Sequence, residues 1–136
     1  MDDVARKLGI QPGKSVLLLD APPEAEAFVK EISPPGVSFA TTAGERPYDM
    51  ILFWPRSLEG LVERFAWLQG LIRPEGAVWA IIPKKKYTRA MGIDFSWEQM
   101  QAAALQTDLV DNKTASFSQE EYATRFVIRK ARRKPD

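Results

Sequence analysis

The chain has 136 residues, of which 45% are hydrophobic and 27% charged. A chain of this length fits one domain that buries roughly two-thirds of the surface its unfolded form exposes, so we expect residues 1–136 to form a single domain. The absence of cysteine and histidine excludes disulfides, thiolate zinc sites and most nucleophile–base pairs, and we expect no metal site. The net charge of +1 gives no overall field that favours nucleic acid or an anionic membrane.

The first third of the chain alternates helical patterns with apolar runs. Residues 3–8 predict a short helix that Gly9 ends, and residues 15–20 form an apolar run without polar alternation. Such a run is typical of a strand covered on both faces, as in the centre of a parallel sheet. Residues 22–32 then predict an amphipathic helix, followed by a short strand at 37–40 and a loop.

The middle of the chain repeats this alternation. Residues 49–54 predict a second interior strand, which ends at Pro55. Ser57 is the expected N-cap of a long helix, with Trp67 at or near its core face, and residues 77–82 predict a strand that buries Trp79. The apolar repeat that predicts this helix consists of Leu58, Leu61, Val62, Phe65, Leu68 and Ile72.

The last third predicts a helix and an antiparallel pair of strands. Ser96 and Gln99 have the spacing of a capping box, so a helix is expected over about 96–107. Residues 109–117 and 122–130 predict the paired strands, and residues 131–136 predict a flexible basic tail. Alternating strands and helices with short connections favour a mostly parallel sheet with helices on both faces.

Three segments resemble the class I methyltransferases. Residues 8–20 resemble the approach to the first strand of that family, residues 48–51 its fourth strand, and residues 71–79 the turn into its fifth. The resemblance implies a three-layer α/β/α Rossmann-like fold, a shortened methyltransferase topology with a C-terminal antiparallel hairpin. The chain is similar, more closely, to a family of short uncharacterised bacterial proteins with a Trp-x-x-x-Pro-Lys strand end, here residues 79–84, which has no established activity.

The glycine residues of the cofactor-binding turn that this resemblance implies are replaced in this chain. Methyltransferases bind S-adenosylmethionine on a glycine-rich turn after the first strand, and an acidic residue about twenty positions later binds the ribose. With Asp20 aligned to the acidic residue of the motif, Pro22, Glu24 and Glu26 fall on its glycine positions, and residues 40–42 offer no acid. We therefore expect no cofactor and no methyl transfer from a chain whose cofactor motif is degenerate.

A candidate ligand site remains at the carboxyl edge of the predicted sheet, where open α/β sheets bind ligands. Its side chains would hold a phosphate or carboxylate in a basic, aromatic-walled crevice. The structural alternative is that the lysines lie in a solvated loop, the arginine pairs with a nearby acid, and Asp20 accepts backbone hydrogen bonds from residues 21–24. The candidate residues are Asp20, Trp54, Arg56, Lys84 and Lys85.

Three functions stay open at the level of sequence. The leading hypothesis is a non-catalytic binding or interaction module on a methyltransferase-like frame. The alternative is an enzyme or binder for an anionic or nucleotide-like small molecule, with Asp20 or Glu24 as a carboxylate acid/base, and the third is a structural partner or homodimer. The basic residues within 84–86 and 130–134 are the candidates for nucleic-acid binding, which is disfavoured because the net charge is balanced and no recognition motif is present. An acidic start and the lack of a long apolar run predict a cytoplasmic protein without a membrane segment.

Overall fold

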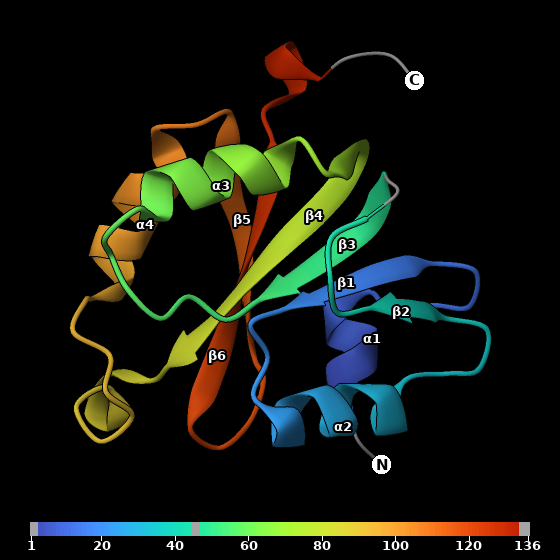
Figure 1. Ribbon diagram of the computed structural model, residues 1–136, viewed down its shortest axis with the longest axis horizontal. Coiled ribbons are helices and arrows are strands. Elements are labelled where there is room, and N and C mark those ends of the chain that lie inside the picture. Colours follow the sequence, from blue (N-terminus) through green and yellow to red (C-terminus); the bar gives the residue numbers. More distant parts are fainter. Residues whose placement is uncertain (1–2, 45–46, 134–136) are drawn as a thin grey trace.

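The computed structural model describes residues 3–44 and 47–133, which form a six-stranded sheet flanked by helices (Figure 1). The strands follow the order β2-β1-β3-β4-β6-β5. They are β1 (Ser15–Leu19), β2 (Ser38–Ala40), β3 (Tyr48–Phe53), β4 (Ile72–Pro83), β5 (Leu109–Ser116) and β6 (Glu121–Ile128). The helices are α1 (Val4–Leu8), α2 (Pro23–Ile32), α3 (Leu61–Gln69) and α4 (Trp97–Leu105), with the 3₁₀ turns η1 (Lys85–Tyr87) and η2 (Lys130–Arg132).

The four strands β2, β1, β3 and β4 are parallel, and this confirms the predicted parallel centre. Leu17 of β1 lies opposite Ile51 of β3, which in turn lies opposite Val78 of β4, and all three side chains are buried. β6 pairs with β4 in the antiparallel sense and β5 closes the sheet beside β6, as predicted for the C-terminal hairpin. The uninterrupted apolar runs therefore correspond to strands that have neighbours on both sides and helices on both faces.

Two apolar cores lie on opposite faces of the sheet, because successive strand residues point to opposite sides. Leu17 and Leu19 point into the core under α3 and α4, whereas Val16 and Leu18 point into the core under α1 and α2. Figure 1 shows these two helix pairs on either side of the strands. The predicted three-layer α/β/α arrangement is thus confirmed.

A buried hydrogen bond fixes α1 to the centre of the sheet. The indole Nε1 of Trp79, which is fully buried in β4, donates to the carbonyl oxygen of Leu8 at 3.0 Å. Gly9 follows in the left-handed region with φ of 85°, and its N–H bonds to the carbonyls of the last helical turn. Glycine adopts this conformation without a steric penalty, so the chain leaves α1 at the predicted residue.

The predicted start and end of the long helix are wrong. α3 begins at Leu61, after Gly60 in the left-handed region with φ of 73°, and the Ser57 hydroxyl accepts from the backbone N–H of Glu59 at 3.1 Å instead of capping the helix. Ile72 belongs to β4, where it lies opposite Tyr48 at a register shift, so β4 begins earlier than residue 77. Helical spacing from Leu58 to Ile72 continued past both ends because apolar loop and strand residues happened to extend it.

The prediction that Trp67 lies at or near the core is also wrong. The Trp67 residue is 45% exposed, and its ring lies 5.7 Å from the guanidinium carbon of Arg64. Trp67 follows the fully buried Phe65 by two positions, which places it about 200° around the helix from that residue. The buried face of α3 is therefore formed by Leu61, Phe65 and Leu68.

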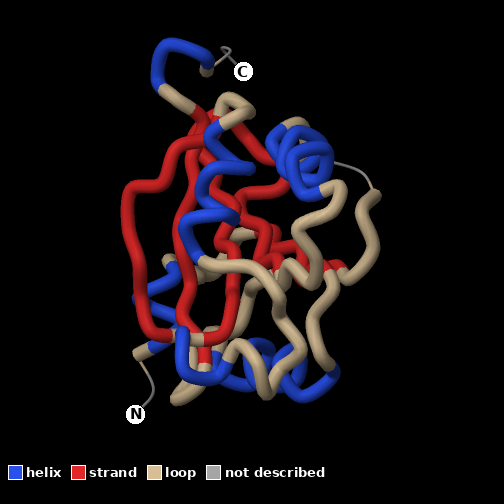
Figure 2. Tube along the Cα trace, turned by 90° about the vertical axis from the view of Figure 1, so that its left-hand side faces the viewer, coloured by secondary structure: helices blue, strands red, loops and turns tan. Residues whose placement is uncertain are grey.

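After β6 the chain forms the turn η2, which projects beyond the sheet at the end where β6 finishes (Figure 2). The Arg133 side chain donates from Nε to the carbonyl oxygen of Ile128 at 2.9 Å. The predicted tail at 131–136 overlaps this turn, and its last residues, 134–136, lie outside the described residues. In the described part of the chain, none of the helices has the length and apolar character needed to cross a bilayer.

We predict that Trp79→Phe destabilises the fold by about 1–3 kcal/mol, because the carbonyl of Leu8 would remain buried without its donor. Urea unfolding followed by circular dichroism measures this free energy. Trp67→Phe is the matched control, since an exposed aromatic substitution changes stability by about 0.5 kcal/mol or less. Equal losses in the two variants would contradict the structural role given to the Trp79 indole.

Candidate functional site

The turn after β1 places a carboxylate at the carboxyl edge of the sheet. β1 ends at Leu19, and Asp20 follows in the left-handed region with φ of 61°. Asp20 is the one residue other than glycine with a positive φ in the described part of the chain. Aspartate and asparagine tolerate this region better than most side chains, so the residue type suits the sharp exit from the strand.

The side chain of Asp20 is bound by an arginine from α3. The Arg64 Nη2 atom lies 2.6 Å from Asp20 Oδ2, and both side chains are partly exposed. The backbone carbonyl of Asp20 accepts a long contact of 3.5 Å from Arg56 Nη2. The alternative in which the Asp20 carboxylate caps residues 21–24 is therefore wrong, because the ion pair with Arg64 takes its place.

Asp20 and Arg56, two of the predicted site residues, line one pocket of about 240 Å³. Arg64 and Glu59 also line it, so two positive and two negative side chains balance in charge. The guanidinium carbon of Arg64 lies 5.3 Å from the centroid of the Phe53 ring, a cation–π distance. We call this cavity the carboxyl-edge pocket. It is small, and two of its four charged side chains, Asp20 and Arg64, bind each other.

Sequence reasoning missed Arg64, the residue that organises the carboxyl-edge pocket. Arg64 and Asp20 are 44 positions apart, and nothing local to either residue indicates the pair. An arginine between the apolar positions of an amphipathic helix is an ordinary solvent-facing residue by pattern alone. Only the packing of α3 against the end of β1 and β3 brings the two charges together.

Trp54 does not form a wall of this pocket. Its side chain is buried, with 1% exposure, and packs edge-to-face on Phe117 with ring centroids 5.7 Å apart. Phe53, the last residue of β3, points toward α3, whereas Trp54 directly after it belongs to the core on the opposite face, under α2. The Trp54 Nε1 atom is buried without a hydrogen-bond partner among the described residues.

The two lysines are divided between the strand end and a separate pocket. The backbone N–H of Lys84 donates to the carbonyl of Glu120 at 2.7 Å, which continues the pairing of β4 with the hairpin. Lys85 begins η1 and lines a pocket of about 480 Å³, together with Ile82, Phe95, Trp97 and Tyr122. The structure thus brings Asp20 and Arg56 together but places neither lysine in their pocket.

The pocket beside Lys85 has both apolar and polar walls, and it contains the partly buried phenol of Tyr122. Burial, and then the negative charge of Glu98, raise the pKa of Tyr122 to about 12. At the start of α4, Ser96 and Gln99 form the predicted capping box: the Ser96 N–H donates to Gln99 Oε1 at 2.9 Å, and the Gln99 N–H donates to the Ser96 hydroxyl at 3.1 Å. Asp94 and Glu98 line this pocket together with Lys85, so its lining is mixed in polarity.

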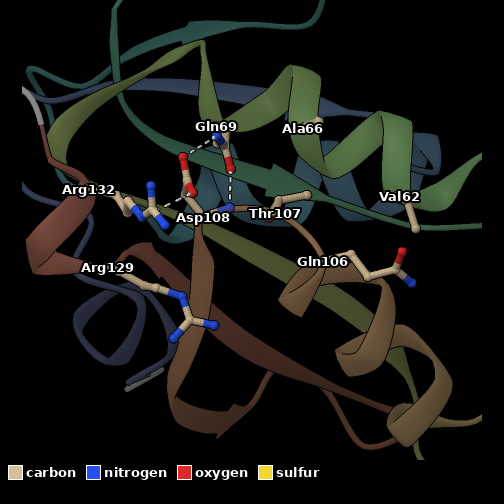
Figure 3. Close-up of a pocket in the computed structure, with 8 residues that line it drawn as sticks. All are labelled: Val62, Ala66, Gln69, Gln106, Thr107, Asp108, Arg129 and Arg132. Atoms are coloured by element: carbon tan, nitrogen blue, oxygen red, sulfur yellow. Dashed lines mark hydrogen bonds and ion pairs between the residues drawn. The ribbon is translucent and has the colours of Figure 1, made fainter.

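Another cavity, of about 580 Å³, lies at the opposite, amino edge of the parallel strands and is shown in Figure 3. Gln69 binds Asp108 twice: its Nε2 donates to the carboxylate at 3.2 Å, and its Oε1 accepts from the Asp108 backbone N–H at 2.9 Å. Arg132 lies 3.9 Å from the same carboxylate. These bonds join α3 to β5, so the polar groups of this cavity have a structural role.

The turn that would hold a methyltransferase cofactor is built from imino acids and engaged acids. Pro22 is the N-cap of α2 and Pro23 its first residue. Glu26 pairs with Lys30 at 2.9 Å along the helix surface. Within residues 3–44 and 47–133, no group of three potential metal ligands is close enough to hold an ion.

The hairpin contributes an acid to the carboxyl edge at Glu121. Burial raises the pKa of Glu121, the positive charge of Arg56 lowers it, and the negative charges of Glu120 and Glu24 raise it further. The net effect is a raised pKa, because burial dominates. Arg56 thus lies within electrostatic range of an acid from β6 as well as the backbone of Asp20.

We predict that Glu121→Gln stabilises the protein near neutral pH and that this gain disappears below about pH 4.5, the ordinary pKa of the group. The native state holds this proton more tightly than the unfolded chain, so ionisation of Glu121 costs stability as the pH rises through the raised pKa. Thermal unfolding from pH 4 to pH 8 checks this. Glu63→Gln, on the exposed side of α3, is the control for removal of a carboxylate, and a gain that is independent of pH would contradict the prediction.

Comparisons with solved structures give the same fold. A TehB-like SAM-dependent methyltransferase from Corynebacterium glutamicum matches with a TM-score of 0.55 and 12% identity over 87% of this chain and 82% of that one. The N-methyltransferase NodS from Bradyrhizobium japonicum matches with a TM-score of 0.55 and 10% identity over 92% and 89%. The pyocyanin biosynthetic protein PhzM matches with a TM-score of 0.67 and 10% identity, over 93% of this chain and 53% of its own length.

Comparison of the sequence with known families and curated proteins does not assign the chain to a family. No family model matches the chain, and no curated protein sequence matches it. Identities this low establish a shared fold and leave the activity open. The chain therefore has the Rossmann-like α/β fold of the SAM-dependent methyltransferases.

Proposed function

We propose that this chain is a non-catalytic binding or interaction module on a methyltransferase-like frame, and that it does not bind S-adenosylmethionine in the usual way. The observation that carries the proposal is the turn from β1 into α2, the place where this fold approaches its cofactor. Here the turn consists of a left-handed aspartate bound to Arg64, then Ala21 and two prolines.

The turn offers few backbone donors. Pro23 has no amide hydrogen, and the N–H groups of Ala25 and Glu26 both donate to the carbonyl oxygen of Pro22 at 3.0 Å. A glycine-rich turn leaves its amides free and allows the ligand to approach the backbone closely. The proline rings occupy the space that a close approach of the ligand requires. The carboxylate of Glu24 repels the methionine carboxylate of the ligand.

The volume and the second contact also disfavour the cofactor. The carboxyl-edge pocket holds about 240 Å³, below the range of roughly 300–1,000 Å³ of most ligand sites. β2 ends at Ala40 and is followed by Thr41 and Thr42, so no acid stands where this fold binds the ribose hydroxyls. Loss of both contacts supports a frame retained without its methyl donor.

We predict that neither S-adenosylmethionine nor S-adenosylhomocysteine changes the thermal midpoint of unfolding. A ligand that binds the native state and is present at about 100 times its Kd would stabilise it by about 2.7 kcal/mol, a readily measured shift. A methyltransferase that binds both compounds, run in parallel, establishes that the ligands are intact. Micromolar binding in a calorimetric titration would overturn the proposal.

A second candidate function is the binding or conversion of an anionic or nucleotide-like small molecule at the same edge. The observation in its favour is Arg56, an exposed cation in the carboxyl-edge pocket. Its contact with the Asp20 carbonyl is long, at 3.5 Å, so the guanidinium is not tightly held by the protein. Asp20 is held by Arg64, which leaves the exposed Glu24 as the carboxylate that is available for acid/base chemistry.

We predict for this second function that Arg56→Ala weakens adenosine monophosphate about tenfold, the loss expected for one hydrogen-bonded charge. Isothermal titration with the monophosphate checks this, and Lys84→Ala tests whether the neighbouring strand end contributes. Arg89→Ala, an exposed cation after η1, is the control. If Arg56→Ala and Arg89→Ala behave alike, the carboxyl-edge pocket is not the binding site.

A further inference from the structure

A basic pocket lies at the amino edge of the parallel strands, on the face covered by α1. It is bounded by the end of α1, the first residues of β3 and β4, and the middle of β5 and β6, and its volume is about 310 Å³. We call it the basic pocket. Its charged lining consists of Arg6, Lys7, Lys14, Lys113 and Arg125, with Asp49 and Glu75.

The basic pocket carries an excess of positive charge. Five cationic side chains stand against two carboxylates, which leaves an excess of three positive charges. Asp49 is already engaged, because its Oδ1 accepts from Arg73 Nε at 2.9 Å and its Oδ2 from the Ser15 backbone N–H at 2.9 Å. The remaining carboxylate, Glu75, cannot balance the positive charge of the pocket. The whole chain has a net charge of only +1, so positive charge is concentrated at this pocket.

Arg125 is a partly buried cation in the lining of the basic pocket. It lies opposite Trp79 in the pairing of β6 with β4, so its side chain is on the α1 face and partly buried. Among the described residues, no acceptor or carboxylate binds its guanidinium. Burial, and then the positive charge of Arg133, lower the pKa of Arg125, as expected for a cation that lacks a counter-ion.

The walls of the basic pocket are fixed before any ligand arrives. The Trp79 indole holds the Leu8 carbonyl at 3.0 Å, which secures the end of α1 on the sheet. Lys113 Nζ donates to the carbonyl of Lys7 at 3.2 Å, which joins α1 to the edge strand β5. Preformed walls reduce the conformational entropy lost on binding.

We propose that the basic pocket binds a small molecule that carries two or more phosphate groups. Each phosphate monoester brings about 1.5–2 negative charges, so two groups match the excess of three positive charges. Arginine binds phosphate oxygens through paired N–H donors, and Arg125 has these donors free. The volume, at the lower end of ligand pockets, suits a compact polyphosphate.

A small molecule fits this site better than a nucleic-acid strand does. The five cations come from four separate segments of the chain and converge on one cavity. A strand of nucleic acid requires a track of cations along a groove, with aromatic side chains on which bases stack. The aromatic residue in this pocket, Trp79, is fully buried and cannot stack on a base.

The test is a calorimetric titration of the whole chain with inorganic pyrophosphate at low ionic strength, supported by thermal unfolding. We expect pyrophosphate to bind and to raise the unfolding midpoint, and Arg125→Gln to weaken binding about tenfold or more. Lys14→Gln, at the rim of the pocket, should weaken it in the same direction and remains informative if Arg125→Gln does not fold. Arg89→Gln, an exposed cation beyond the carboxyl edge, should leave the affinity within about twofold.

Three outcomes would overturn the proposal. The first is the absence of pyrophosphate binding at low millimolar concentration, and the second is an equal loss in Arg89→Gln, which would indicate general charge attraction. The third is binding of citrate or of a single-stranded oligonucleotide that is tighter than the binding of pyrophosphate. In that outcome, Lys130→Gln weakens this binding and Arg125→Gln does not. The basic pocket lies at the opposite edge from the carboxyl-edge pocket, so this result does not depend on whether S-adenosylmethionine binds.

Discussion

The burial of β1, β3 and β4 on both faces is the constraint on which the rest of the structure depends. Their backbone groups can be satisfied only by neighbouring strands, and their side chains require apolar cover above and below. α1 and α2 supply one cover, while α3 and α4 supply the other. Every strand-to-helix connection must therefore reverse direction at a sheet edge, and the polar residues of these turns gather in two places.

The two edges have different chemistry because different connections reach them. At the carboxyl edge, the Asp20 carboxylate pairs with Arg64, the Asp20 carbonyl makes a long contact with Arg56, and Glu121 adds an acid from the hairpin. At the amino edge, cations from α1, β5 and β6 converge, and Arg125 lacks a counter-ion among the described residues. The charges that line the carboxyl-edge pocket thus balance, whereas those that line the basic pocket leave an excess of positive charge.

Predictions from sequence succeeded where local pattern and burial agree. The apolar runs at 15–20 and 49–54 became parallel neighbours, and the Ser96 capping box and the Gly9 helix end formed as expected. They failed where a periodic pattern continued by coincidence, as at the two ends of α3. Of the candidate site residues, Asp20 and Arg56 share a pocket, whereas Trp54 is buried under α2 because strand residues alternate between faces.

The sequence by itself determined the fold class, the order of strands and helices, and the imino acids and charges of the turn after β1. These features depend on residue type and short-range periodicity, which are visible along the chain. Only the tertiary structure decided the Asp20–Arg64 ion pair and the basic pocket, because their members lie on separate elements of the chain. Side chains so far apart in sequence meet through packing of helices on a twisted sheet, and no local pattern records that packing.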